Sequence, residues 1–139
     1  MKSSIVRILV TLSLVAALSP LALMAQSRVN ITIPFDFTVG TKFFRAGDYR
    51  VQEMTDKVLL IRNVKSGPAV MTIVMPDLNT EKSGLSRLTF HHYGDSYFLY
   101  SVASGSRGWR LLPSRAEKEL IAKAGSPKPV SVAAAVTSK

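Results

Sequence analysis

The stretch that decides the fold is Val29–Val39, VNITIPFDFTV. Apolar side chains recur there at every second position, at residues 29, 31, 33, 35, 37 and 39. Because successive residues of an extended chain point to opposite faces, this alternation predicts a half-buried β-strand. Pro34 lies on the polar side and lacks a backbone N–H, which predicts a sheet edge, or a bulge where one strand becomes two.

Further short apolar segments follow, separated by turn signals. They are KFFR (42–45), YRVQEM (49–54), KVLLIRNV (57–64), AVMTIVM (69–75) and a last one near residues 109–112. The segment 57–64 is apolar on both faces, which is typical of a central strand. With no helical pattern between these segments, the sequence predicts an all-β fold, either an antiparallel β-sandwich or a partly closed barrel.

The segment Leu88–Tyr100, LTFHHYGDSYFLY, has the pattern of a β-hairpin. A two-residue turn at Gly94-Asp95 places His92 opposite Tyr97. Neighbouring strand residues point to opposite faces, so His91 and His92 cannot bind one metal ion from a regular strand. The hairpin therefore predicts packed aromatic side chains rather than a metal centre.

The residues that catalysis needs do not form a recognisable pattern. The chain has two histidines and no cysteine, whereas a zinc site needs about three protein ligands. No nucleophile elbow surrounds a serine, no glycine loop is built to hold phosphate, and no two carboxylates are marked as partners. We therefore predict a non-enzymatic protein without catalytic residues, a metal site or a cofactor.

A single helix is predicted near the C-terminus, over residues 114–124, in PSRAEKELIAKAG. Ser114 is the predicted N-cap, Glu117 is its capping-box partner, and Gly125 ends the helix. Ala116 and Leu120 share one side of this helix. We expect that narrow apolar stripe to lie across a sheet or to cover an open barrel end.

The N-terminus has the organisation of a secretory signal peptide over residues 1–25. Lys2 and Arg7 precede an apolar run, and Ala25 offers a small residue for cleavage. The alternative is a retained membrane anchor, although the run is close to the minimum length for a spanning helix. Cleavage predicts a secreted or periplasmic protein with no membrane span.

Cleavage would leave one β-domain, residues 26–124, followed by a tail, residues 125–139. Pro127 and Pro129 interrupt regular structure, and the rest of the tail is small and polar. This composition predicts disorder.

The formal net charge is +9, from 18 basic and 9 acidic residues. Loss of Lys2 and Arg7 with the signal peptide leaves about +7. An exported basic protein encounters membrane phosphates and anionic cell-wall polymers. The alternative is that the charge serves solubility alone, because the basic residues are scattered.

Aromatic and basic residues interleave in the second half of the chain, and they suggest a stacking surface for a polyanionic glycan or another envelope component. No specific nucleic-acid partner is predicted. The candidate ligand-binding residues are Arg87, His91, Tyr100, Arg107, Trp109 and Arg110.

The chain resembles a family of small, uncharacterised, exported bacterial β-proteins. The matching blocks are IPFDFTVG, AGDYRV, VLLIRN, LTFHHYGDSYFLYSV and LPSRAEKEL, which together run over most of residues 31–120. Two departures are Phe44-Arg45, where relatives usually carry Leu-Pro, and a helix start that is less rich in arginine. The resemblance implies an exported β-domain and supplies no catalytic residue.

The leading functional prediction is an exported, non-enzymatic β-domain with a structural or interaction role at the cell envelope. The alternative is a carrier that holds a small apolar ligand in a barrel cavity. The residues expected to line that cavity are Leu59, Ile61, Met71 and Ile73.

Overall fold

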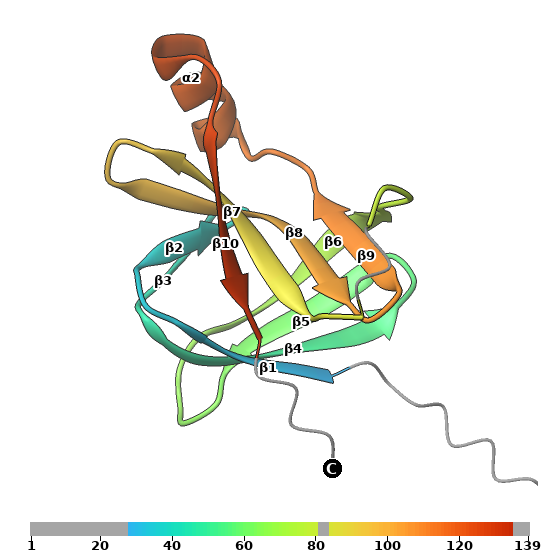
Figure 1. The fold of residues 1–139 in the computed structure, drawn as a ribbon. Helices are drawn as coiled ribbons and strands as arrows, with labels where there is room; N and C mark the ends of the chain where they lie inside the picture. The colour runs from blue at the N-terminus through green and yellow to red at the C-terminus, as the bar shows by residue number, and fades with distance from the viewer. Residues whose placement is uncertain (1–27, 81–83, 135–139) are drawn as a thin grey trace, which may run out of the picture.

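The computed structural model describes residues 28–80 and 84–134 (Figure 1). The predicted signal peptide lies outside these residues. The elements are β1 (Arg28–Ile33), β2 (Phe37–Val39), β3 (Lys42–Phe44), β4 (Gly47–Thr55), β5 (Val58–Asn63), β6 (Ala69–Pro76), β7 (Arg87–Tyr93), β8 (Ser96–Ser104), β9 (Arg107–Leu111), α2 (Arg115–Ala124) and β10 (Lys128–Ala133). No helix in the described ranges is long and apolar enough to cross a membrane.

The strands form two layers that share one strand, β6. The first layer is β1-β4-β5-β6, and the second contains β6, β9, β8, β7 and β10, with β2 and β3 at its corner. β6 pairs with β5 through residues 69–73 and with β9 through residues 74–76. The predicted all-β fold with one C-terminal helix is confirmed, and the sheet is not closed into a barrel.

The sheet is mixed, with one parallel pairing among antiparallel ones. β2 runs parallel to β8, with Thr38 opposite Phe98. The chain leaves the first layer after β1 and enters the second as β2, so β2 arrives alongside β8 in the same direction.

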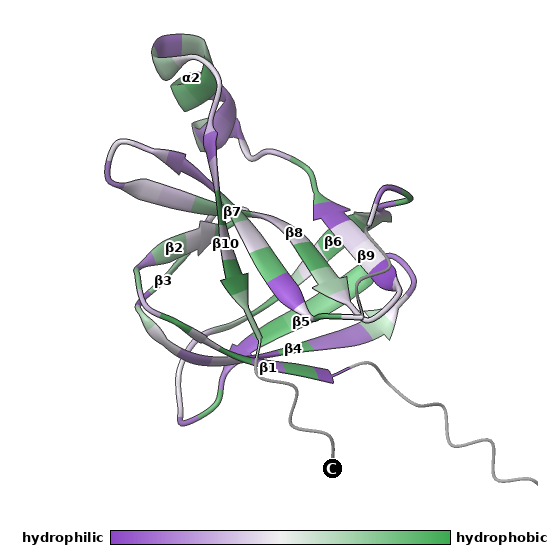
Figure 2. Ribbon diagram, in the orientation of Figure 1, coloured by the Kyte–Doolittle hydropathy of each residue, from purple (hydrophilic) through white to green (hydrophobic). Residues whose placement is uncertain are grey.

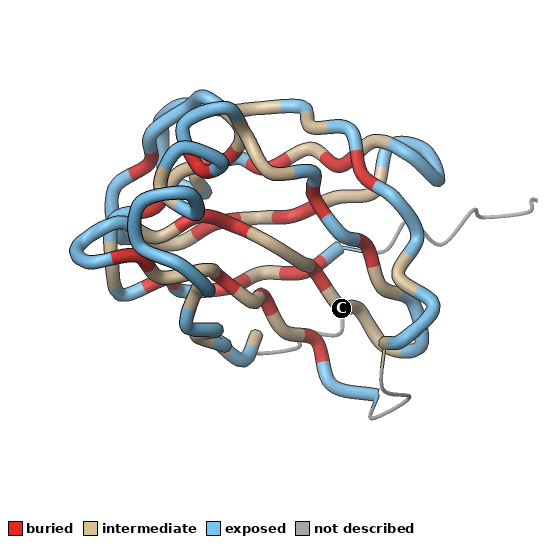
Figure 3. Tube along the Cα trace, turned by 90° about the horizontal axis from the view of Figure 1, so that it is seen from above, coloured by how far each residue is buried: buried red, intermediate tan, exposed pale blue. Residues whose placement is uncertain are grey.

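The predicted strand over residues 29–39 is confirmed, together with its interruption. β1 ends at Ile33 and β2 begins at Phe37, so the break falls at Pro34–Asp36. The alternation continues across this corner, and Val29, Ile31, Ile33, Phe37 and Val39 are all buried. Figure 2 shows the same alternation of apolar and polar residues along the strands, and Figure 3 shows buried positions recurring along the strands, with exposed positions mostly in the connections.

The hairpin has the predicted turn and register. His92 lies opposite Tyr97, and Phe90 lies opposite Leu99. Further along, Thr89 pairs with Ser101, so Tyr100 is the extra residue of a bulge.

The predicted helix is confirmed with its caps, whereas its expected packing is wrong. The Ser114 side chain accepts a hydrogen bond from the Glu117 N–H at 3.2 Å, and the Gly125 N–H donates to the Ile121 carbonyl at 3.0 Å. Ile121 is 37% exposed, and the buried residue of α2 is Glu117. Figure 1 shows why: α2 stands beyond the end of the sheets and approaches them only with its first turns.

The predicted disordered tail is also corrected, because β10 pairs with β7 over residues 128–133. Among the strands of the described residues β10 pairs with β7 alone, so it is an edge strand, the position in which a sheet tolerates proline. Val130 and Val132 lie opposite Phe90 and Leu88 of the core. The rest of the predicted tail, residues 135–139, lies outside the described residues.

The side chains expected to line a carrier cavity are divided between two environments. Leu59 and Ile61 are buried in the core, whereas Met71 and Ile73 are exposed on the outer face of the first layer. On β6 the even-numbered positions 70, 72 and 74 face inward, so Met71 and Ile73 face outward. The predicted placement of Met71 and Ile73 is therefore wrong.

Candidate functional site

Four of the six predicted ligand-binding residues lie on one surface, the outer face of β7, β8 and β9, which we call the polar face. Arg87 and His91 come from β7, Tyr100 from β8 and Arg110 from β9. The strand register brings them together, because Ser101 pairs with Thr89 on one side and with Arg110 on the other.

The other two predicted residues face the opposite side of β9. Trp109 is 3% exposed and packs in the core, and a buried ring cannot stack on a ligand at the surface. Arg107 donates to Glu53 at 2.8 Å and to Asp56 at 3.0 Å, and its guanidinium lies 5.4 Å from the Trp109 ring centroid. Arg107 therefore ties β9 to β4 and the β4–β5 turn, and the structure does not bring it to the polar face.

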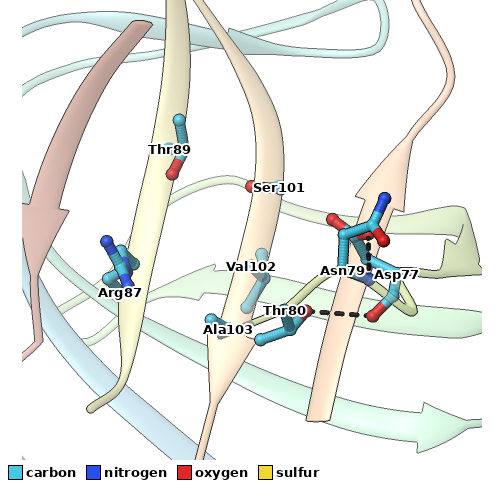
Figure 4. A pocket seen from close by; sticks show the side chains of 8 residues that line it. All are labelled: Asp77, Asn79, Thr80, Arg87, Thr89, Ser101, Val102 and Ala103. Atoms are coloured by element: carbon cyan, nitrogen blue, oxygen red, sulfur yellow. Dashed lines mark hydrogen bonds between the residues drawn. The ribbon is translucent and has the colours of Figure 1, made fainter. Parts of the chain in front are cut away.

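A hollow of about 240 Å³ lies in the polar face, between β7, β8 and the loop after β6 (Figure 4). Its lining is mostly polar and consists of Asp77, Asn79, Thr80, Arg87, Thr89, Ser101, Val102 and Ala103. Such a hollow is below the usual volume of pockets that enclose whole ligands, roughly 300–1,000 Å³. Its size suits one sugar residue or a charged substituent.

The loop that forms one wall of the hollow is held by its own hydrogen bonds. Asp77 donates its N–H to the Gly108 carbonyl at 2.8 Å and accepts the Asn79 N–H on its carboxylate at 3.1 Å. The Thr80 hydroxyl donates to the Asp77 carbonyl at 3.0 Å. Thr80 lies directly over Gly108, where a Cβ would fall 1.5 Å from the Thr80 hydroxyl oxygen. Gly108 is therefore required for the loop to close onto β9.

The polar face also holds a chain of contacts from Asp77 to His91. The hydrogen bond with Tyr100, followed by electrostatic interaction with Tyr100 and with the Asp77 carboxylate, raises the pKa of Arg110 above its usual range. The His91 ring stacks on Tyr100, with centroids 4.0 Å apart and planes 20° apart. Arg110 therefore stays cationic beside two stacked rings, an arrangement suited to an anionic, hydroxyl-rich ligand.

Next to these rings, α2 is fastened to the sheet by a buried carboxylate. Glu117 Oε1 lies 2.9 Å from His91 Nδ1, and the Tyr93 hydroxyl donates to the same oxygen at 3.4 Å. A carboxylate only accepts hydrogen bonds, so Nδ1 carries a proton in this pair. Burial, and then the charge of Glu117, raises the pKa of Tyr93.

This carboxylate–imidazole pair fixes the orientation of His91. The same pairing orients histidines in metal sites and catalytic triads. In the part of the chain that the structure describes, no three His, Cys, Asp or Glu side chains are grouped to hold a metal ion. The contact instead joins two structural elements, because Glu117 is the side chain that α2 buries.

Part of the remaining site could be predicted from local sequence patterns. Glu117 occupies the third helical position, where the capping pattern predicted it, but its backbone N–H makes the cap and its carboxylate turns to β7. The loop residues Asp77, Asn79 and Thr80 follow the apolar segment 69–75, and no local pattern indicated that this loop folds onto β9. The sequence Asp77-Leu78-Asn79 favours a turn, and this was the local indication that the chain bends here.

The fold and the site define a two-layer, all-β domain with one helix and a polar hollow on its outer surface. No family model, no curated protein and no solved structure matches the chain. The functional argument therefore depends on the geometry of this surface.

Proposed function

We propose that this chain is an exported, non-enzymatic domain of the cell envelope that binds a polyanionic glycan on its polar face. The observation that supports the proposal most directly is the hollow itself. Hydroxyl groups of Thr80, Thr89 and Ser101 and the amide of Asn79 surround it, and Arg87 lies on its wall.

Charge supports an anionic ligand over a neutral one. Arg87 on β7 and Arg110 on β9 flank the Thr89–Ser101 pair, and among the described residues that line the hollow Asp77 is the carboxylate. Arginine forms bidentate hydrogen bonds with sulfate, phosphate and carboxylate groups. The net charge of about +7 that remains after loss of residues 1–25 favours the approach of a polyanion over longer distances.

The stacked rings of His91 and Tyr100 are evidence that the ligand contains a sugar ring, which would lie next to these charges. The two rings present an aromatic surface adjacent to the hollow, and Glu117 holds His91 in place. Binding to a surface whose side chains are already oriented loses less conformational entropy than binding to free side chains.

Secretion of the domain is part of this proposal, and it favours an anionic polymer as the ligand. The signal-peptide pattern of residues 1–25 predicts that the domain meets anionic polymers outside the cytoplasm. N-terminal sequencing of the protein from the periplasmic or culture fraction tests this step, with cleavage near Ala25 as the expected result.

Binding is tested with heparin as the probe, by measuring affinity over a range of salt concentrations. We expect Arg87→Gln and Arg110→Gln each to weaken binding and to reduce the slope of log affinity against log salt by about one. Arg115→Gln is the matched control, because its side chain is 95% exposed on α2 and the same charge is removed. No retention at low salt, or an equal loss in the control, would contradict the proposal.

A further inference from the structure

The outer face of the first layer carries a contiguous row of apolar side chains, which we call the apolar face. It consists of Val58 and Leu60 on β5 and Met71, Ile73 and Met75 on β6. Leu60 lies opposite Met71, and Val58 lies opposite Ile73, so the residues are neighbours. Met71 is 64% exposed and Ile73 is 71% exposed.

This exposure is unusual because β5 is a central strand. Its inner residues Leu59 and Ile61 fill the core, and its outer residues are apolar as well. A strand that is apolar on both sides is expected where both sides are covered. Scattered apolar side chains at a surface need no explanation, whereas a contiguous group indicates an interaction site.

Arginines border the apolar face on both sides. On one side, Arg62 lies two residues after Leu60 on the same face of β5 and opposite Arg50 of β4. On the other side, Arg110 of β9 lies opposite Met75. Two acids lie at these borders: Asp48 is two residues before Arg50 and accepts a hydrogen bond from the Thr32 hydroxyl at 2.6 Å, and Asp77 lies near Arg110. Two other acids point away from the apolar face. Glu53 lies opposite Leu59, on the inner side, where it pairs with Arg107, and Asp56 also pairs with Arg107.

We propose that the apolar face docks on an anionic lipid surface. Apolar side chains enter the boundary of the acyl region, and the bordering arginines reach the lipid phosphates with their long side chains. Charge complementarity selects this occupant over a second copy of the chain. A twofold interface through the same face would place the arginine borders of the two copies near each other.

The proposal is independent of glycan binding, because the hollow lies on the other layer. Arg110 is the one residue at the edge of both surfaces, since it lies opposite Met75 on one side and Ser101 on the other. We therefore exclude Arg110 from the test.

The test is co-sedimentation of the full-length exported protein with vesicles of equal parts phosphatidylglycerol and phosphatidylcholine at low salt. We expect Met71→Gln/Ile73→Gln to weaken vesicle binding at least about tenfold, from the apolar area that no longer leaves water. Arg62→Gln is expected to weaken binding about fivefold. All variants share the same N-terminus after processing, so any contribution from it cancels in the comparison.

The matched control is Phe43→Gln/Leu85→Gln, which also replaces two apolar side chains by glutamine, at positions that are 60% and 64% exposed and are not part of the apolar face. We expect this control to bind vesicles as the unaltered protein does. Equal binding by the Met71→Gln/Ile73→Gln variant, or equal binding to pure phosphatidylcholine vesicles, overturns the proposal. A dimer that this variant dissociates, with no vesicle binding, would identify the face as a self-interface and also overturns it.

Discussion

The two layers share one core and present opposite chemistry on their outer faces. The polar face of β7–β9 is held by hydrogen bonds and ring stacking, such as the contacts of Glu117 with His91 and of His91 with Tyr100. The apolar face of β5–β6 exposes unbranched methionines beside Ile73. The alternation of residues along the strands determines the inner face, whereas the outer positions are free to differ between the layers.

The two faces also differ in how firmly their side chains are held in place. Side chains of the polar face have fixed partners, which suits recognition of one arrangement of donors and acceptors. Methionine has flexible, polarizable side chains that adapt to irregular apolar surfaces. We therefore expect damage to one face to leave binding at the other unchanged, and the predictions below test this separation.

The largest expected effect is from Glu117→Ala. This change leaves the buried donors of His91 and Tyr93 without their acceptor and removes the contact that fastens α2 to β7, so we expect a loss of about 3 kcal/mol in the free energy of unfolding. Urea unfolding measures it. Heparin binding should weaken as His91 loses its orientation, while vesicle binding should persist.

Two further variants check the cause of that loss. Glu117→Gln keeps an acceptor oxygen and should restore more than half of the stability. Glu119→Ala removes a carboxylate that is 60% exposed and should cost no more than about 0.5 kcal/mol. A similar loss from Glu119→Ala would show that helix charge, and not the buried contact, is responsible.

A smaller effect is expected from Gly108→Ala. The new Cβ would meet the Thr80 side chain, so the loop at 77–80 must move away from β9, at a cost of about 2 kcal/mol. Heparin affinity should fall because one wall of the hollow is displaced. In the Gly108→Ala/Thr80→Gly double variant the clash is absent, and stability should be higher than the two single losses predict together. Additive losses would contradict this explanation.

The smallest effect concerns Tyr93 and alkaline pH. Its pKa is raised above the ordinary value of 10.0, so the folded state favours the protonated phenol. The resulting stabilisation is fully present below about pH 10 and is lost as pH rises through the raised pKa. Tyr93→Phe should therefore lose less stability than the unaltered protein between pH 9 and about pH 11.

Tyr97→Phe serves as the matched control for the alkaline measurement, because Tyr97 lies across the same hairpin on the other face. We expect it to retain the full loss of stability at high pH. If both variants behave alike, the alkaline loss does not arise at Tyr93.

Local patterns in the sequence predicted the elements that local interactions determine. The alternation of residues 29–39, the Gly94-Asp95 turn and the Ser114 cap each depend on a few neighbouring residues, and all three are present. The expected break at Pro34 follows from its missing N–H, which is again a local property.

The features that the sequence did not predict depend on contacts between distant segments. β10 was missed because proline excludes a central strand and permits an edge strand, and the position of a strand in a sheet is not a local property. The parallel pairing of β2 with β8, the closure of the 77–80 loop on Gly108 and the turn of Glu117 toward His91 are long-range in the same way. In the candidate site, four of the predicted residues meet on the polar face, but the burial of Trp109 depends on which side of β9 faces the core.

The pairing of β10 with β7 has a consequence for the order of folding. Val130 and Val132 complete the packing around Leu88 and Phe90, which are synthesised some 40 residues earlier. Until β10 emerges, β7 has an open edge and the hydrophobic interior is incomplete. A chain that stops before residue 128 therefore leaves the β7 edge unpaired beside Leu88 and Phe90.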